Sequence, residues 1–224
     1  MIQSSIDALL IGRPTLFRAD GTMSAIARKP VETPVMLREF GFDGDEVADS
    51  KVHGGAEKAV HSYPSEHYDY WNEYFVSQGS VPPGLLNTAG AFGENISSSG
   101  MTEKKVRIGD RFRLGNALVE VAQGRQPCWK IDHHLGHQGL SAAIIESGRC
   151  GLYFRVLEEG LVAPHDKIEQ VEQASLKWTV EHVFRLLIGG GHKGESAKGD
   201  LVALSKLESL AKSWRIRATK LAGI

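Results

Sequence analysis

The stretch that most constrains the fold is a run of short apolar segments between residues 106 and 122. The dipeptides Gly109-Asp110 and Gly115-Asn116 separate these segments. Such pairs accept the positive φ angles of tight turns between antiparallel strands. We therefore predict a β-meander whose last strand, at 118–122, ends just before the loop that carries Cys128.

Short strands and helices alternate along the rest of the chain. Apolar runs bounded by glycine or proline predict strands, and an apolar stripe at helical spacing predicts a helix. Strands are expected at 6–11, 23–28, 35–38, 58–63, 151–157 and 161–171, and helices at 64–75, 140–146, 178–188, 200–211 and 213–221. We predict a mainly β fold with α-helices, in which residues 1–174 form a β domain and residues 175–224 form a three-helix extension.

Composition excludes several classes of protein. The chain has 224 residues, of which 42% are apolar and 24% charged, as in an ordinary soluble protein. A net charge of -1 gives no electrostatic reason to expect nucleic acid or a membrane surface. Two cysteines are too few for a disulfide framework, and the first residues lack the basic and apolar regions of a signal peptide. We expect a cytoplasmic protein.

Cys128 is the strongest candidate for chemistry. It follows Pro127 and lies between Arg125 and Lys130, and nearby cations favour the thiolate form of a cysteine. We therefore expect this thiol to bind a ligand or to react. The other cysteine, Cys150, precedes a predicted strand and is most simply a small buried hydrophobic residue.

A glycine pair supplies a second candidate site. Gly54 and Gly55 permit positive φ angles and a close backbone approach, which lets amide groups hold an anion. Lys51, His53 and Lys58 flank the pair with positive charge. A tight hairpin would also use two glycines, so both interpretations stay open. The segment lacks the ending of a nucleotide-binding P-loop.

A third candidate is Gly93-Glu94-Asn95. Its carboxylate and amide, beside a flexible glycine, could hold a polar ligand. A plain turn before a strand accounts for the same residues equally well.

The usual protein metal sites are not expected. Residues 40–49 carry four carboxylates but lack the EF-hand register, and the simplest interpretation is a solvated loop. Cys128 could be combined with His133, His134 and His137 in a zinc site. Their spacing matches none of the common zinc patterns.

Taken together, these motifs resemble a MOSC domain, the module named for the C-terminal part of molybdenum-cofactor sulfurase. The resemblance is strongest to the stand-alone bacterial YiiM-type branch, which has a three-helix C-terminal extension, and it covers most of residues 1–221. It is carried by residues 51–55 with the helix that follows, 92–96, 109–110, 125–128, 151–157 and 210–215.

The resemblance implies a mixed β-barrel of the pyruvate-kinase-barrel type that binds the molybdenum cofactor (molybdopterin). It implies an oxidoreductase that reduces small N-hydroxylated compounds, such as hydroxylaminopurines and amidoximes, and so detoxifies base analogues. A flavoprotein reductase would be the electron donor. The chain departs from the family at Gly124, where proline is common, and at His165-Asp166, where Gly-Asp is common.

The resemblance also implies roles for the candidate residues. Cys128 would be the metal ligand and a catalytic residue, Arg125 a phosphate anchor, and Asn95 a partner for the pterin edge. The remaining cofactor-binding candidates are Lys51, His53, Gly54, Gly55, Lys58, Gly93, Glu94 and Lys130. Asp132 is a speculative proton donor to the departing hydroxyl, although a surface carboxylate paired with Lys130 is an equally good interpretation.

Two other functions remain open. Cys128 could carry a persulfide, which would make the protein a sulfur carrier. Alternatively, the chain could be a non-catalytic cofactor-binding module with its three-helix extension as a docking piece. No nucleic acid or membrane partner is expected, and homodimer formation is left open.

Overall fold

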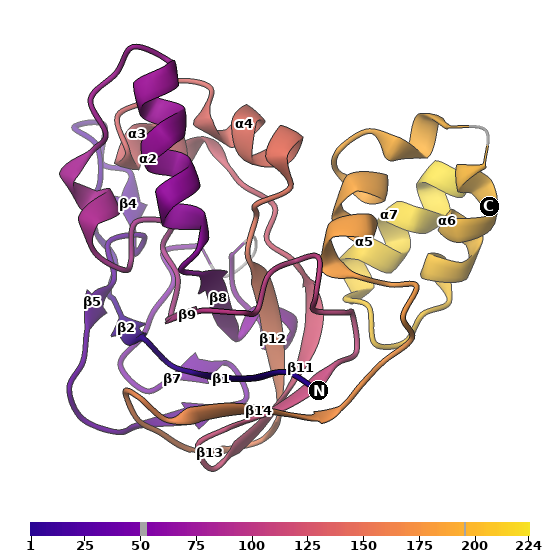
Figure 1. Ribbon diagram of the computed structural model, residues 1–224, viewed down its shortest axis with the longest axis horizontal. Helices are drawn as coiled ribbons and strands as arrows, with labels where there is room; N and C mark the ends of the chain where they lie inside the picture. Colours follow the sequence, from indigo (N-terminus) through magenta and orange to yellow (C-terminus); the bar gives the residue numbers. More distant parts are fainter. Residues whose placement is uncertain (50–52, 195) are drawn as a thin grey trace.

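A nine-stranded sheet is the centre of the computed structural model, which describes residues 1–49, 53–194 and 196–224 (Figure 1). Its strand order is β1-β14-β10-β11-β12-β8-β9-β2-β5. The strands are β1 (Gln3–Ser5), β2 (Ala8–Ile11), β5 (Lys29–Pro30), β8 (Val60–Pro64), β9 (Ile96–Ser98), β10 (Arg111–Leu114), β11 (Ala117–Gly124), β12 (Leu152–Glu158) and β14 (Lys167–Glu172). The pair β8–β9 is parallel and its neighbours in the sheet are antiparallel.

The sheet is curled, and the described strands do not close it into a barrel. Strands β1 and β2 lie toward opposite ends of the order, yet only Ile6 and Asp7 separate them in the chain. The amide of Ile6 donates to the Asp166 carbonyl at 3.0 Å, and that of Asp7 to the Ser97 carbonyl at 2.9 Å. The chain thus passes from one side of the sheet to the other at Ile6 and Asp7, where single hydrogen bonds take the place of a strand ladder. The mainly β prediction is confirmed, whereas the expected closed barrel is not found.

Smaller elements surround this sheet. Strands β13 (Gly160–Val162), β6 (Val35–Arg38) and β7 (Gly41–Phe42) form a second sheet, and β3 (Thr15–Leu16) pairs with β4 (Met23–Ser24). Helices α2 (His67–Ser77), α3 (Trp129–His134) and α4 (Leu140–Ser147) lie together beyond one end of the large sheet (Figure 1). The short 3₁₀ helices are η1 (Ala56–Lys58), η2 (Gly84–Asn87) and η3 (Gly191–Lys193).

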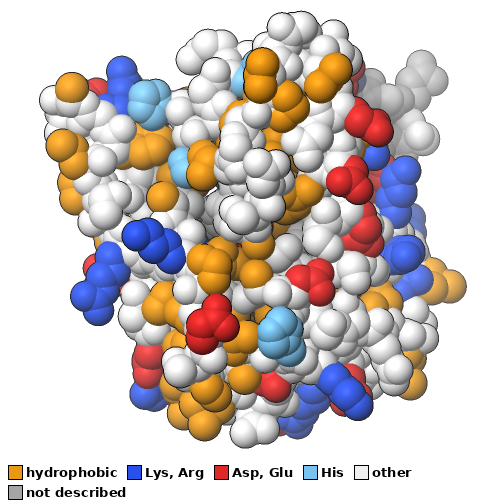
Figure 2. Space-filling model, turned by 60° about the vertical axis from the view of Figure 1, so that its left-hand side comes forward, with side chains coloured by type: hydrophobic (Ala, Val, Ile, Leu, Met, Phe, Trp, Pro, Cys, Tyr) orange, Lys and Arg blue, Asp and Glu red, His pale blue; other side chains and the backbone are white. Residues whose placement is uncertain are grey.

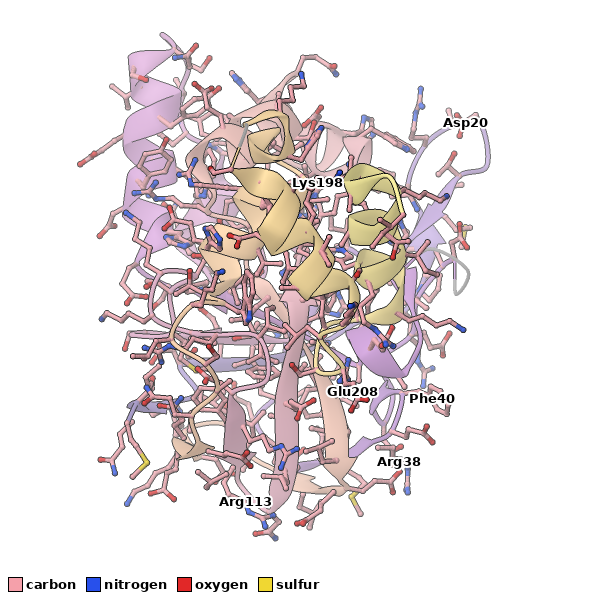
Figure 3. All side chains as sticks on the ribbon, turned by 90° about the vertical axis from the view of Figure 1, so that its right-hand side faces the viewer. Asp20, Arg38, Phe40, Arg113, Lys198 and Glu208 are labelled. Atoms are coloured by element: carbon pink, nitrogen blue, oxygen red, sulfur yellow. The ribbon has the colours of Figure 1, made fainter. Side chains whose placement is uncertain are left out.

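The C-terminal helices form a lobe beside the sheet. They are α5 (Val180–Leu187), α6 (Ala197–Ser205) and α7 (Lys212–Ala222), and they cover one end of the long central strands (Figure 3). Thr179 caps α5 within the helix predicted at 178–188, and its hydroxyl oxygen accepts from the His182 amide at 3.2 Å. Phe184 and Trp214 of the lobe belong to the same hydrophobic cluster as Phe154 of β12. One continuous core therefore joins the sheet and the helices.

Local turn chemistry predicted some elements well and others poorly. The hairpin of β10 and β11 forms as expected, with Leu114 opposite Ala117. The segment before it is no strand: Arg107 makes only an isolated bridge to Thr179. The predicted strand at 161–171 is two strands, because the chain turns at His165, whose φ is 68°. Helix α2 begins at His67, since Pro64 still pairs with Ser98 in β8.

The surface carries charges of both signs. On the face shown in Figure 2, acidic and basic side chains are interspersed with apolar ones. None of the described helices combines the length and hydropathy that a membrane span requires.

Candidate functional site

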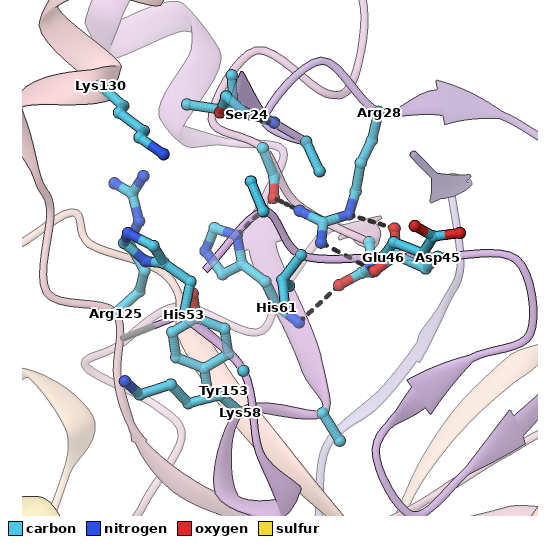
Figure 4. Close-up of a pocket in the computed structure, with 18 of the residues that line it drawn as sticks. Ser24, Arg28, Asp45, Glu46, His53, Lys58, His61, Arg125, Lys130 and Tyr153 are labelled. Atoms are coloured by element: carbon cyan, nitrogen blue, oxygen red, sulfur yellow. Dashed lines mark hydrogen bonds and ion pairs between the residues drawn. The ribbon is translucent and has the colours of Figure 1, made fainter. Parts of the chain in front are cut away.

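A cavity of about 440 Å³ lies between the loop that follows β11, the glycine-rich loop before η1, and strands β8 and β12 (Figure 4). It brings together most of the residues that the sequence suggested. The predicted residues in its lining are His53, Gly54, Gly55, Lys58, Gly93, Asn95, Arg125, Cys128 and Lys130. Lys51 lies outside the described residues, and Glu94 and Asp132 are not in the described lining.

Arg125 and Cys128 come to the cavity because β11 ends at Gly124. The Arg125 amide donates to the Gly151 carbonyl at 3.0 Å, which continues the alignment of β11 with β12 by one residue. Arg125 is only 7% exposed, and its Nη1 is buried without a hydrogen-bond partner in the described structure. Burying a guanidinium donor without a partner is costly, so the site suits an anion that would supply the missing acceptor. Cys128 is a partly exposed free thiol with extended backbone, directly before α3.

Positive charge dominates this wall of the cavity. Partial burial lowers the pKa of His53 below its ordinary value of 6.5, and the nearby charges of Lys130, Lys58 and Arg125 lower it further. Figure 4 shows the Arg125 guanidinium and the Lys130 ammonium on the same side as the His53 ring. The arrangement therefore favours a neutral imidazole at neutral pH within a cationic surround.

The opposite wall holds an ion pair that the sequence did not reveal. Arg28 donates through Nε and Nη2 to the two carboxylate oxygens of Asp45, both at 2.8 Å, and through Nη1 to the Gly93 carbonyl at 2.6 Å. The side chains of Arg28 and Asp45 are 11% and 7% exposed. Residues 40–49 are therefore not simply a solvated loop, because Asp45 is buried in this pair. No local sequence pattern predicts this pair, because Arg28 and Asp45 lie in separate loops.

Asn95 and Glu94 of the Gly93-Glu94-Asn95 segment have different structural roles. Asn95 lines the cavity, but its amide group already accepts from the His61 amide at 3.1 Å and donates to the Leu10 carbonyl at 3.2 Å. Its Nδ2 also donates to Asp45 at 3.0 Å.

Glu94 is fully buried and organises the turn that leads to this segment. Its carboxylate accepts from the Gly90 amide at 2.7 Å, from the Phe92 amide at 3.1 Å and from the Tyr68 hydroxyl. Burial raises the pKa of Glu94, while these donors oppose the rise. The carboxylate is therefore bound within this turn and does not line the cavity.

Asp132 also points elsewhere. Its two carboxylate oxygens accept from the amide and the hydroxyl of Ser141 at 2.6 and 3.0 Å. Ser141 lies in the first turn of α4, so Asp132 caps that helix from outside and ties α3 to it. Lys130 does not pair with Asp132 and donates instead to the Met23 carbonyl at 3.0 Å. Neither interpretation offered for Asp132 matches these contacts.

His61 and Tyr153 are cavity residues that sequence reasoning missed. They are register partners on the antiparallel strands β8 and β12, with ring centroids 5.1 Å apart. Nδ1 of His61 donates to the Gly93 carbonyl at 3.1 Å. Burial lowers the pKa of His61 well below 6.5, and Arg125 adds to the effect. Burial also raises the pKa of Tyr153. The only available signal was a polar residue within each apolar strand.

The donor set limits what metal chemistry the cavity can support. Among residues 1–49, 53–194 and 196–224, no group of three or more His, Cys, Asp or Glu side chains could hold a metal ion. A metal at Cys128 would therefore bring most of its ligands with it, as a metal in an organic cofactor does.

The curled β fold with its cationic, thiol-bearing cavity belongs to a known protein family. The profile of the MOSC domain family matches residues 49–169, and the chain belongs to this family. It is 40% identical over 156 residues to protein YiiM of Escherichia coli (strain K12), a match that covers 70% of this chain and 67% of that protein. These similarities make it a YiiM-type MOSC protein.

Other relatives support the same assignment. The uncharacterised protein YflK of Bacillus subtilis (strain 168) is 38% identical over 216 residues, which cover 94% of this chain and 91% of that one. A Gibberella moniliformis (strain M3125 / FGSC 7600) protein named reductase is 36% identical over 165 residues, or 73% of this chain and 28% of the longer relative. The crystal structure of YiiM from Geobacillus stearothermophilus superposes with a TM-score of 0.79 at 30% identity, covering 98% of this chain and 99% of that one.

Proposed function

We propose that this protein is a molybdenum-cofactor-dependent oxidoreductase that reduces N-hydroxylated compounds. One observation carries the proposal: Nη1 of Arg125, buried and without a hydrogen-bond partner among the described residues, and the free thiol of Cys128 belong to the same cavity. An anion receptor beside a soft metal ligand suits a cofactor that has a phosphate at one end and a thiophilic metal at the other.

The residues present fit that cofactor. Cys128 would ligate the metal, and Arg125 would bind the phosphate through the guanidinium donor that lacks a partner. Gly55, with a φ of 100° and open space on its Cβ side, lets the backbone approach a ligand closely. The described lysines near this end are Lys58 and Lys130, and His53 adds a neutral imidazole. When bound, the cofactor would supply two-electron transfer.

Reduction of an N-hydroxyl group breaks the N–O bond and consumes two electrons and two protons, giving an N–H group and water: an aminopurine from a hydroxylaminopurine, or an amidine from an amidoxime. The protein's own task is to hold the reacting group near Cys128 and to protonate the departing oxygen. The cavity groups able to carry a proton include His53, Lys130 and Tyr153. Asp132 is not among them because it binds Ser141. We propose a flavoprotein reductase as the source of the electrons.

The similarity to MOSC and YiiM proteins and to a relative named reductase supports the oxidoreductase class. The substrate is the finer part of the proposal. It is tested by incubating purified protein with a hydroxylaminopurine or an amidoxime and a reduced flavoprotein reductase, and measuring the aminopurine or the amidine that forms. We expect turnover that Cys128→Ala abolishes and that Cys150→Ser keeps, because the Cys150 thiol is buried outside the cavity lining.

Two results would contradict the proposal. The first is molybdenum-loaded protein that forms neither the aminopurine nor the amidine. The second is a persulfide on Cys128 that passes its sulfur to an acceptor, which would identify a sulfur carrier instead.

A further inference from the structure

Glu57 connects the glycine-rich loop to the C-terminal lobe. It lies in η1 between two cavity residues, Gly55 and Lys58, but does not line the cavity itself. Both of its carboxylate oxygens accept from the backbone amide of Lys212 at 2.9 Å. The same carboxylate pairs with Nη2 of Arg155 at 3.2 Å. Glu57, next to the glycine-rich loop, is thus held by two contacts, one with Lys212 and one with Arg155.

The contact with Lys212 is a helix cap supplied from elsewhere in the chain. Lys212 is the first residue of α7, and the residue before it, Ala211, has no side chain able to cap the helix. The first amides of a helix lack partners within the helix, and a carboxylate there also interacts favourably with the helix dipole. Glu57 provides this carboxylate, although 155 residues separate it from Lys212.

Behind Glu57, an ion network reaches into the large sheet. Nη1 of Arg155 donates to Glu120 at 2.9 Å, and Nε of Arg111 donates to the other oxygen of Glu120 at 2.9 Å. Glu120 is buried, so the Arg155–Glu120 pair is shielded from solvent more than a surface pair would be, whereas the Glu57 side chain is 36% exposed. The position of Glu57 is therefore set by the sheet as well as by α7.

The same end of α7 also supports the Cys128 loop. The Ala211 amide donates to the Ala122 carbonyl of β11 at 3.0 Å. A Cβ on Gly124, the residue before Arg125, would lie 3.3 Å from Phe184 and 3.3 Å from Trp214. The lobe thus packs directly against the strand end that delivers Arg125 to the cavity.

From these contacts we infer that Glu57 is a positioning residue, and that the start of α7 holds the glycine-rich loop before η1 and the loop that follows β11 at a set separation. The C-terminal lobe is then a structural part of the site. The inference rests on the proposed function only for the identity of the ligand.

The test removes the Glu57–Lys212 hydrogen bond from each side. Glu57→Ala deletes the acceptor. Lys212→Pro deletes the donor but preserves the helix, because proline is favoured at the first helical position and Ala211 has the extended conformation that precedes proline well. Lys212→Ala is the matched control, since it loses the same side chain and keeps the amide. Glu57→Gln keeps a neutral acceptor.

Two readouts are measured on the full-length protein: molybdenum retained per chain after gel filtration, and amide hydrogen exchange of residues 55–59. We expect Glu57→Ala and Lys212→Pro to speed local exchange about tenfold and to lose cofactor. Lys212→Ala should match wild type, and Glu57→Gln should fall between. The double variant should add little to Glu57→Ala, because that change already removes the hydrogen bond that Lys212→Pro removes.

Wild-type exchange and molybdenum retention in both Glu57→Ala and Lys212→Pro would overturn the inference. Equal effects of Lys212→Ala and Lys212→Pro would overturn it too, since the amide would then be irrelevant. Wild-type protein without molybdenum would contradict the proposed function, whereas exchange at residues 55–59 would still decide the role of Glu57.

Discussion

The buried guanidinium of Arg125 indicates what kind of ligand the cavity binds. A guanidinium has five donors in a rigid fork, and burial of one of them without a partner is unfavourable unless something else supplies the acceptor. The acidic residues in the described lining, Asp45 and Glu46, pair with Arg28 and Arg13. The residue is therefore better explained as a receptor for an anion than as a structural ion pair.

His61 makes the stability of the folded protein dependent on pH. The unfolded chain protonates this histidine below about pH 6.5, whereas the buried ring in the folded protein resists protonation to a lower pH. The free energy of unfolding should therefore fall as the pH drops from about 7 to about 5. Replacing His61 with Gln should reduce this slope by at most about 1.4 kcal/mol per pH unit.

Urea denaturation at a series of pH values measures this slope. His53 and His134, whose pKa values are also lowered by burial, contribute in the same direction, so the comparison with the His61 variant isolates one group. Identical slopes for wild type and His61→Gln would show that His61 is protonated equally in both states.

At the scale of elements, the turn between β13 and β14 departs from what its conformation prefers. His165 has a φ of 68°, in the left-handed region that glycine adopts without strain. The turn is held by the His165 amide, which donates to the Ile6 carbonyl at 3.1 Å, and by Asp166, which accepts from the Ala163 amide at 2.7 Å. Glycine is common at this position in the family that the sequence resembles, and the positive φ angle gives the physical reason.

We predict that His165→Gly raises the free energy of unfolding by about 0.5–1 kcal/mol, because the relief of strain exceeds the added flexibility of the unfolded chain. Chemical denaturation measures this change. His165→Ala, which keeps a Cβ, is the control and should give no gain. A loss of stability in the glycine variant would show that the imidazole makes a favourable interaction that outweighs the strain.

Elements set by local chemistry could be predicted from the sequence, whereas those set by distant partners could not. The β10–β11 hairpin follows from Gly115-Asn116, and the start of α5 follows from Thr179. By contrast, the Arg28–Asp45 pair joins two loops that carry no shared pattern. The contact of Asp132 with Ser141 could not be predicted for the same reason, because Ser141 lies in another helix.

Across the whole molecule, the lobe and the sheet share one hydrophobic core. Phe184 and Trp214 are buried with the residues of β11 and β12 in the same cluster. The sequence correctly predicted a helical segment after residue 175, but it could not show that α7 begins against Glu57. Such contacts between distant segments decide where a site forms, and single-sequence patterns do not contain them.

The residues of the candidate site also include some that the sequence predicted and some that it did not. Cys128, Arg125 and the glycine pair were found because charge and glycine are visible in the sequence, and the fold brings them into one cavity. His61 and Tyr153 were missed because they resemble ordinary strand residues until β8 pairs with β12.

The most direct test of the central claim is the molybdenum content of the purified protein, compared with that of Cys128→Ala. Removing a soft thiolate ligand should remove the metal's bond to the protein. We predict close to one molybdenum per wild-type chain and a large loss in the variant, with Cys150→Ser unchanged. Wild-type protein free of molybdenum, or a Cys128→Ala variant that retains it fully, would contradict the account.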